Sequence, residues 1–114
     1  MQECLFCQIA AGEVEADVVH SSDNVVAFRD INPQAPVHIV MIPKEHLESA
    51  RVLRDKHGDL LAEMFTAAAH LAKANDIDRW GWRVVTNVGA DAGQSVHHLH
   101  FHLLGGRQMK WPPG

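Results

Sequence analysis

Short apolar runs rich in β-branched residues dominate the first third of the chain. Two of them, residues 17–21 and 25–29, are separated by Ser22-Asp23-Asn24, an arrangement that predicts a β-hairpin. A third run, residues 37–42, follows one proline and stops at another, and it predicts a further strand. Ahead of these strands, residues 4–11 predict a short helix that ends at Gly12.

The hydrophobic period becomes helical in the middle of the chain. Between Lys56 and Asn75 apolar residues recur on one face, which predicts one long helix with Asp55 or Asp59 near its N-terminus as a cap or dipole partner. Strand character returns at residues 82–88 and 96–104. This order predicts an α+β fold, with a mainly antiparallel sheet of about five strands, one long helix and a short N-terminal helix.

Length and composition narrow the class of protein. A chain of 114 residues predicts a single domain, residues 1–114, in which residues 105–114 form a C-terminal tail. A net charge of -4 without a basic stripe disfavours general binding to nucleic acid. No run approaches the roughly 20 apolar residues of a membrane span, and the N-terminus lacks the features of a signal peptide. We therefore expect a cytoplasmic protein.

Histidine is the unusual residue of this chain. There are 9 in all, and four of them lie between positions 97 and 102. Because side chains alternate along a strand, His98, His100 and His102 are predicted to share one face, while the three apolar residues Leu99, Phe101 and Leu103 share the other. By the same parity His97 falls on the apolar side, so we expect it at the start of the strand or as an outlier.

Three interpretations of this histidine face are open. A solvated polar face is one, although such faces use Lys, Glu and Thr more often. A metal site made by the three histidines alone is another, although three ligands in a row along a strand diverge. Catalysis at phosphorus is favoured, because imidazole titrates near neutrality, acts as a nucleophile and donates hydrogen bonds to phosphate.

Two neighbouring features bear on the same chemistry. Gly93 lets backbone N–H groups approach an anion, and Ser95 offers a hydroxyl, although ordinary turn chemistry also explains both. Near the N-terminus, Cys4 and Cys7 form a C-x-x-C pair that is either half of a zinc site or two buried thiols.

Three segments carry a specific resemblance to a known family. Residues 93–106 resemble the signature of the histidine-triad (HIT) superfamily, in which three histidines alternate with apolar residues. Residues 30–44 and the tail, residues 105–114, are similar to those of its Hint branch, the purine nucleoside phosphoramidases. The resemblance covers nearly the whole chain and implies the HIT-like fold.

The resemblance implies a role for each residue around the triad. His100 would attack the α-phosphorus, His102 would bind the phosphate oxygens, and His98 would orient its neighbours. His38 would hold the second ring nitrogen of the nucleophile. Ser95 would hydrogen-bond the bridging atom of the leaving group and help to protonate the amine.

The resemblance also implies a nucleotide site. Asp30 would bind the ribose hydroxyls, and Asn87 would lie near the ribose and phosphate. Five apolar residues would form the base pocket, although plain core packing explains each of them equally well: Leu5, Phe6, Ile9, Phe28 and Ile31.

The implied activity is hydrolysis of the P–N bond of adenosine or guanosine 5'-phosphoramidates through a nucleotidyl-histidine, without Mg²⁺. The alternatives are a dinucleoside polyphosphate hydrolase or nucleotidyl transferase of the same superfamily, and a nucleotide-binding interaction module. Related transferases carry glutamine in place of His102, and the diadenosine-type branch lacks the tail, so both observations disfavour the first alternative.

The resemblance also implies a metal site. Some members hold a structural zinc, for which Cys4, Cys7, His46 and His98 are the candidate ligands here. A side chain of His98 that binds zinc could not also serve as a free hydrogen-bonding member of the triad.

A homodimer is expected as well, because a sheet of this size leaves edges and part of one face to be covered.

Overall fold

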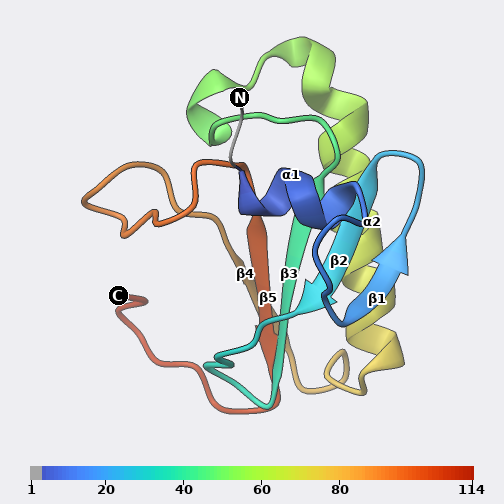
Figure 1. The fold of residues 1–114 in the computed structure, drawn as a ribbon. Coiled ribbons are helices and arrows are strands. Elements are labelled where there is room, and N and C mark those ends of the chain that lie inside the picture. Colours follow the sequence, from blue (N-terminus) through green and yellow to red (C-terminus); the bar gives the residue numbers. More distant parts are fainter. Residues whose placement is uncertain (1–3) are drawn as a thin grey trace.

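The computed structural model describes residues 4–114, which form a five-stranded sheet with a helix on each face (Figure 1). In chain order the elements are α1 (Leu5–Ala10), β1 (Val18–Ser21), β2 (Val25–Arg29), β3 (Val37–Pro43), the short 3-10 turns η1 (Ala50–Val52) and η2 (Asp55–His57), α2 (Gly58–Ala74), β4 (Trp82–Val85) and β5 (Phe101–Gly105). Within the described part of the chain, the helices are too short or too polar to cross a bilayer.

The strands are arranged in the order β1-β2-β3-β5-β4, and every neighbouring pair is antiparallel. The predicted α+β architecture is therefore confirmed. The central strand is β3, and its ladder with β5 runs from Val37 opposite Gly105 to Met41 opposite Phe101. This pairing places residues 38 and 102, which are far apart in sequence, on adjacent strands.

The two faces of the sheet bury different sets of side chains. Ile39, Met41 and Leu103 are fully buried and pack in one cluster with residues of α2, such as Met64. On the opposite face, α1 packs Phe6 in a second cluster with side chains of β2 and β3. Figure 1 shows α2 behind the sheet and the shorter α1 crossing only part of the front. That front face is where the functional site lies.

The helix predictions agree with the structure to within two residues, but one proposed cap is wrong. The long helix begins at Gly58, and its N-cap, His57, makes no side-chain capping bond. Asp59 lies in the first turn, where its charge favours the positive end of the helix dipole. Asp55 belongs instead to the preceding turn η2, because the chain enters α2 through that 3-10 turn.

The last strand begins later than predicted, at Phe101 rather than near residue 96. Continuing the β3 register would set Leu99 opposite Pro43, which has no N–H to donate. The N–H of Leu99 instead donates to the carbonyl of Leu47, 2.6 Å away. His98 and His100 therefore lie in an extended segment beside the sheet, and Gly105, assigned to the tail from sequence, is the last residue of β5.

Candidate active site

The predicted alternation of side chains holds even where the regular ladder ends. Leu99, Phe101 and Leu103 all belong to the cluster under α2. The rings of His98 and His100 instead meet the Phe6 ring edge-on, with centroids 6.0 and 5.0 Å apart. His97, the parity outlier, is exposed. The alternation therefore brings the triad histidines to the face that carries α1.

The main chain of His98 fixes the tautomer of His100. Nδ1 of His100 lies 2.7 Å from the carbonyl oxygen of His98, a partner that can only accept, so Nδ1 carries the proton. The other ring nitrogen, Nε2, then holds a free lone pair. The hydroxyl of Thr86 donates to the carbonyl of His100 over 2.8 Å and takes the place of a strand partner there. His100 is thus a buried imidazole whose hydrogen bonding defines which ring nitrogen can act as the nucleophile.

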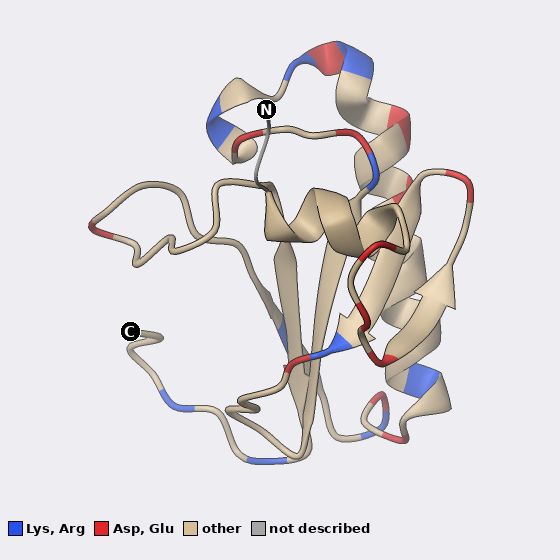
Figure 2. Cartoon of the chain, viewed as in Figure 1, with Lys and Arg blue, Asp and Glu red and all other residues tan. Residues whose placement is uncertain are grey.

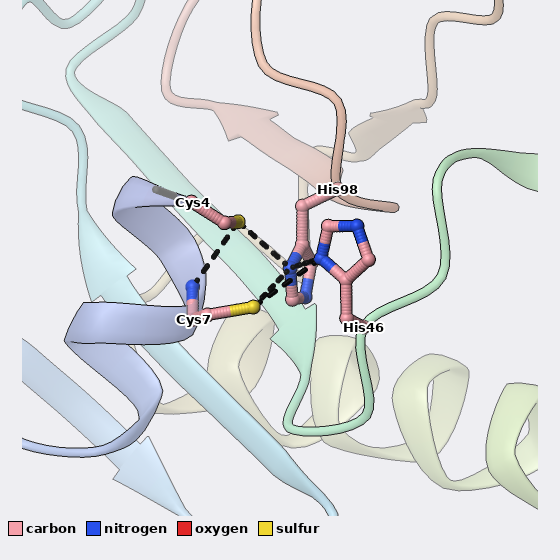
Figure 3. Close-up of side chains that lie close together, drawn as sticks. All are labelled: Cys4, Cys7, His46 and His98. Atoms are coloured by element: carbon pink, nitrogen blue, oxygen red, sulfur yellow. Dashed lines mark hydrogen bonds between the residues drawn. The ribbon is translucent and has the colours of Figure 1, made fainter. Parts of the chain in front are cut away.

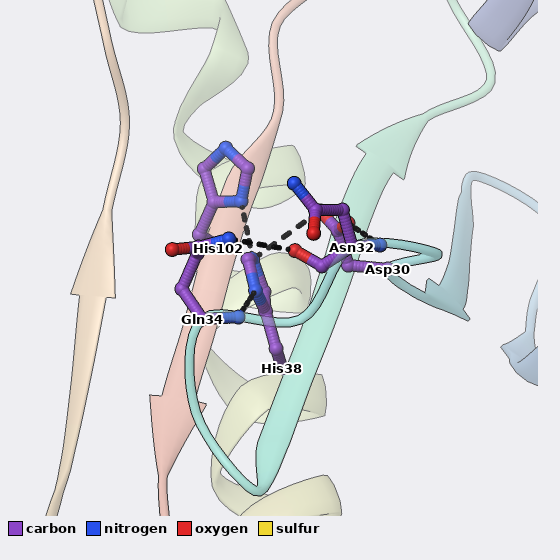
Figure 4. A network of polar contacts seen from close by, with 5 residues as sticks. All are labelled: Asp30, Asn32, Gln34, His38 and His102. Carbon is purple, nitrogen blue, oxygen red and sulfur yellow. Dashed lines mark hydrogen bonds and ion pairs between the residues drawn. The ribbon is translucent and has the colours of Figure 1, made fainter.

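His38 is bonded to His102 rather than to His100, so the role expected for it from the resemblance is wrong. The N–H of Gln34 donates to Nδ1 of His38 over 3.0 Å, which leaves the His38 proton on Nε2. That proton is donated to Nδ1 of His102 over 2.8 Å (Figure 4). Because Nδ1 of His102 accepts, its own proton is on Nε2, which makes Nε2–H a hydrogen-bond donor.

The electrostatics keep this pair neutral. Burial, followed by the charges that His100 and His38 would carry, lowers the pKa of His102 to about 4, and Asp30 opposes the shift. Burial also lowers the pKa of His38, again against Asp30. The Asp30 carboxylate lies 3.4 Å from Nε2 of His38 and accepts from the N–H of Asn32. At neutral pH, His102 therefore offers an N–H rather than a positive charge.

Asp30, His38 and His102 bring three ligand atoms within 4.8 Å of one another. A metal ion there would need the lone pair of His38 Nε2. The N–H of Gln34 places the proton on that very atom, because Nδ1 is already used as an acceptor. The chemistry of these donors therefore fits a hydrogen-bond relay and does not fit a metal site.

An apolar pocket of about 260 Å³ opens beside this cluster. Its lining includes Asp30 and all five residues expected in a base pocket, Leu5, Phe6, Ile9, Phe28 and Ile31. Phe6 and Phe28 also belong to the core cluster on this face, so packing and pocket lining coincide there. Ile31 is fully exposed, at 102%, so plain core packing does not explain it.

The two remaining site residues lie on the connection between β4 and β5. Asn87 is half-buried just after β4, and Ser95 is exposed ahead of the histidines. No local sequence pattern marks three nearby groups that shape the site: the N–H of Gln34, the hydroxyl of Thr86 and the side-chain amide of Gln94. The Gln34 contact depends on the fold of the turn before β3, while Thr86 and Gln94 reach His100 and Glu48 on segments distant in sequence. Local patterns reveal neither kind of contact.

The cysteine pair lies against two histidines at the N-terminal end of α1 (Figure 3). Nδ1 of His98 is 3.3 Å from Sγ of Cys4, 3.5 Å from Sγ of Cys7 and 3.1 Å from Nδ1 of His46. Nδ1 of His46 is in turn 3.2 Å from Sγ of Cys7. Such separations are those between ligands around a tetrahedral zinc, with Zn–S of about 2.3 Å and Zn–N of about 2.0–2.1 Å.

The tautomer of His98 also fits a metal. Nε2 of His98 donates to the carbonyl of Pro43 over 2.8 Å, so Nδ1 turns a lone pair toward the sulfurs. Burial and the neighbouring Cys4 thiol raise the pKa of Cys7 to about 11, so a cation is what would draw off its proton. The ring of His98 faces this cluster, whereas its main-chain carbonyl accepts from the ring of His100. The two roles of His98 therefore do not compete.

Comparison with known proteins places this fold and histidine cluster in one class. The family model described as the C-terminal binding domain of the scavenger mRNA decapping enzyme matches residues 3–111. A HIT family hydrolase from Legionella pneumophila superposes with a TM-score of 0.97 at 50% identity, over 98% of this chain and 100% of that one. The chain belongs to the histidine-triad (HIT) family.

Two curated relatives add detail. A 14 kDa zinc-binding protein from Brassica juncea is 44% identical over 98% of this chain and all of its own. Adenylylsulfatase HINT1 from Arabidopsis thaliana is 44% identical over 96% of this chain and 76% of its own. The chain is thus similar both to a protein named for zinc and to a Hint-type enzyme.

Proposed function

We propose that this protein is a Hint-type nucleoside phosphoramidase, which cleaves the P–N bond of purine nucleoside 5'-phosphoramidates. The observation that carries the proposal is the state of His100. Its Nδ1–H is held by the His98 carbonyl, its Nε2 lone pair is free, and its ring lies against Phe6 at the inner wall of the apolar pocket. A nucleophile is thus fixed beside a site suited to an aromatic base.

The charges around the pocket support one orientation of the nucleotide. Three acidic residues, Glu15, Asp17 and Asp30, line the pocket together with one cation, Arg29, which is paired with Asp17 over 3.6 Å. Figure 2 shows acidic segments after α1 and at the end of β2. Carboxylates repel a phosphate but accept hydrogen bonds from sugar hydroxyls. We therefore place the base among the apolar residues, the ribose at Asp30 and the phosphate at the histidines.

In the first chemical step, Nε2 of His100 forms a bond to the α-phosphorus as the P–N bond breaks. The electron pair of that bond goes to the nitrogen, which accepts a hydrogen bond from the hydroxyl of Ser95, takes a proton from solvent and leaves as an amine. Nε2–H of His102 donates to a phosphate oxygen, where negative charge develops. The positive charge on the nucleotidylated ring is stabilised because its Nδ1–H faces the His98 carbonyl.

In the second step, a water oxygen attacks phosphorus and the bond between phosphorus and Nε2 breaks. The electron pair returns to His100, the water loses a proton to solvent, and the nucleoside 5'-monophosphate is released. Dividing the reaction into two displacements lowers the barrier of each. Apart from this water, the groups that act on the substrate belong to the chain itself.

A bound zinc ion would be held by Cys4, Cys7, His46 and His98. Four protein ligands leave no open position, so such an ion would supply structural stability by tying α1 to the catalytic segment.

We also propose that the protein is a homodimer, since Phe65, Trp80 and Trp111 are exposed and β1 and β4 are edge strands.

The Arabidopsis relative named an adenylylsulfatase favours a second candidate substrate, adenylyl sulfate. Here the same attack by His100 would expel sulfate instead of an amine. Sulfate needs no proton to leave, so this substrate would depend less on Ser95 than an amidate does.

The test compares cleavage of a fluorogenic adenosine phosphoramidate, adenylyl sulfate and a diadenosine polyphosphate by the wild type and by His100→Ala. The amidate should be cleaved fastest, and His100→Ala should lose nearly all activity. His97→Ala is the matched control, because His97 is an exposed histidine of the same segment. Failure to cleave the amidate, or equal cleavage by His100→Ala, would refute the proposal.

A further inference from the structure

The side chain of Gln94 uses both ends of its amide to join three parts of the chain. Oε1 accepts from the N–H of Gly89 over 2.9 Å. Nε2 donates to the carbonyl of Glu48 over 2.9 Å and to that of Val96 over 3.1 Å. A glutamine with three main-chain partners is an organising residue, because it holds each partner in a defined direction.

Gln94 closes the glycine-containing loop that precedes the triad. Its own N–H donates to the carbonyl of Gly89 over 3.1 Å, and the N–H of Gly93 donates to that of Ala90 over 3.0 Å. Gly89 and Gly93 have φ of 81° and 80°, a backbone conformation that residues other than glycine adopt only with strain. The loop is thus shaped by its glycines and fastened at its base by Gln94.

The same side chain fastens this loop to the segment after β3. The carbonyl of Glu48 accepts from Gln94, and the neighbouring carbonyl of Leu47 accepts from the N–H of Leu99 over 2.6 Å. Residues 47–48 thus act as a support along which residues 94–99 lie. On the other side of Ser95, Val96 packs against the cluster that contains Phe6.

Ser95 is consequently held from both sides although it is itself exposed. Gln94 bonds across it to the carbonyl of Val96, so the backbone on either side of Ser95 is spanned by one side-chain contact. A serine that donates to a leaving atom needs its backbone fixed, because a displacement of about 1 Å can cost about 100-fold in rate.

We propose that Gln94 is a positioning residue that holds Ser95 at the leaving-group side of the reaction. This inference rests on the proposed function, because it assumes that Ser95 donates to the departing nitrogen. Its consequence is a dependence on the leaving group. Loss of Gln94 should slow the expulsion of a basic amine, which needs a proton, and spare the expulsion of a group that leaves as a stable anion.

The experiment measures kcat for two AMP derivatives, an alkylamine phosphoramidate and the p-nitrophenyl ester, with wild type, Gln94→Ala, Ser95→Ala and the double variant. On the amidate, Ser95→Ala should lower kcat about 100-fold and Gln94→Ala about 10-fold, with the double variant close to Ser95→Ala. On the ester each variant should stay within about 2-fold of wild type, since nitrophenolate needs no proton.

Two further variants separate positioning from general loosening. Gln94→Glu keeps the acceptor for Gly89 and loses both donors, so it tests the contacts around Ser95 even if Gln94→Ala folds poorly, and it should show the same selective defect. Asn24→Ala removes a side-chain amide contact to Glu63 in the distant β1–β2 turn and should leave both substrates unaffected.

The outcomes are distinguishable. If wild type fails to cleave the amidate, or His100→Ala cleaves it equally, the proposed function fails and this inference fails with it. If wild type cleaves it but Gln94→Ala and Gln94→Glu slow both substrates alike, or the Gln94 and Ser95 effects multiply independently, the positioning role alone is overturned.

Discussion

Acidification should destabilise this fold through His102. In the folded chain its pKa is lowered from 6.5 to about 4, first by burial and then by His100 and His38. As pH falls below 6.5, His102 takes up a proton in the unfolded chain but not in the folded chain. The stability that is present above pH 6.5 is therefore lost progressively between pH 6.5 and about pH 4. Linkage gives a loss from this one residue of about 2 kcal/mol at pH 5 and about 3 kcal/mol at pH 4.

The assay is urea denaturation of wild type and His102→Gln at a series of pH values between 7.5 and 4. His102→Gln lacks the titrating group, so its stability should fall less steeply, by about 2 kcal/mol between pH 7 and pH 5. The comparison cancels acid-sensitive groups that do not touch His102, such as the Cys/His cluster, because both proteins share them. Parallel curves for the two proteins would show instead that the half-buried His102 is not held neutral in the folded chain.

Three further predictions concern other parts of the molecule. Free zinc at a thousand times its Kd should raise the free energy of unfolding by about 4 kcal/mol above that of the zinc-free protein. Cys4→Ser should bind little zinc by elemental analysis. A zinc content equal to that of wild type would contradict the ligand assignment. Gly105→Ala should cost about 1–3 kcal/mol in urea denaturation, because its Cβ would overlap the Ile77 side chain, whereas Gly58→Ala, with open space around it, should cost nothing. Asp30→Asn should weaken AMP binding by calorimetry about 10-fold or more, and unchanged affinity would exclude the ribose contact.

Much of the fold could be predicted from hydrophobic periodicity. The hairpin of β1 and β2 and the long helix follow from local patterns of spacing and turn residues. The early end of the β5 ladder does not, because it depends on Pro43 of another strand, which cannot donate to the position opposite Leu99. A local pattern contains no information about which partner a strand will meet.

The site was predictable as a face but not as a network. Alternation along residues 98–103 was sufficient to place three histidines together. It could not specify that His38 would bond to His102, or that the carbonyl of His98 rather than a side chain would hold His100. These contacts depend on the β3–β5 register and on the departure of the chain from the sheet, which arise only in the folded structure.

The central claim is that His100 becomes covalently nucleotidylated during turnover. Rapid mixing with an adenosine phosphoramidate, acid-free quenching within the first turnover and peptide mass spectrometry test it directly. The account predicts one adenylyl group on the peptide that contains His100, absent from His100→Ala and unchanged in His97→Ala. Cleavage of the amidate by wild type with no adenylyl group on that peptide, or with the group on another residue, would contradict it.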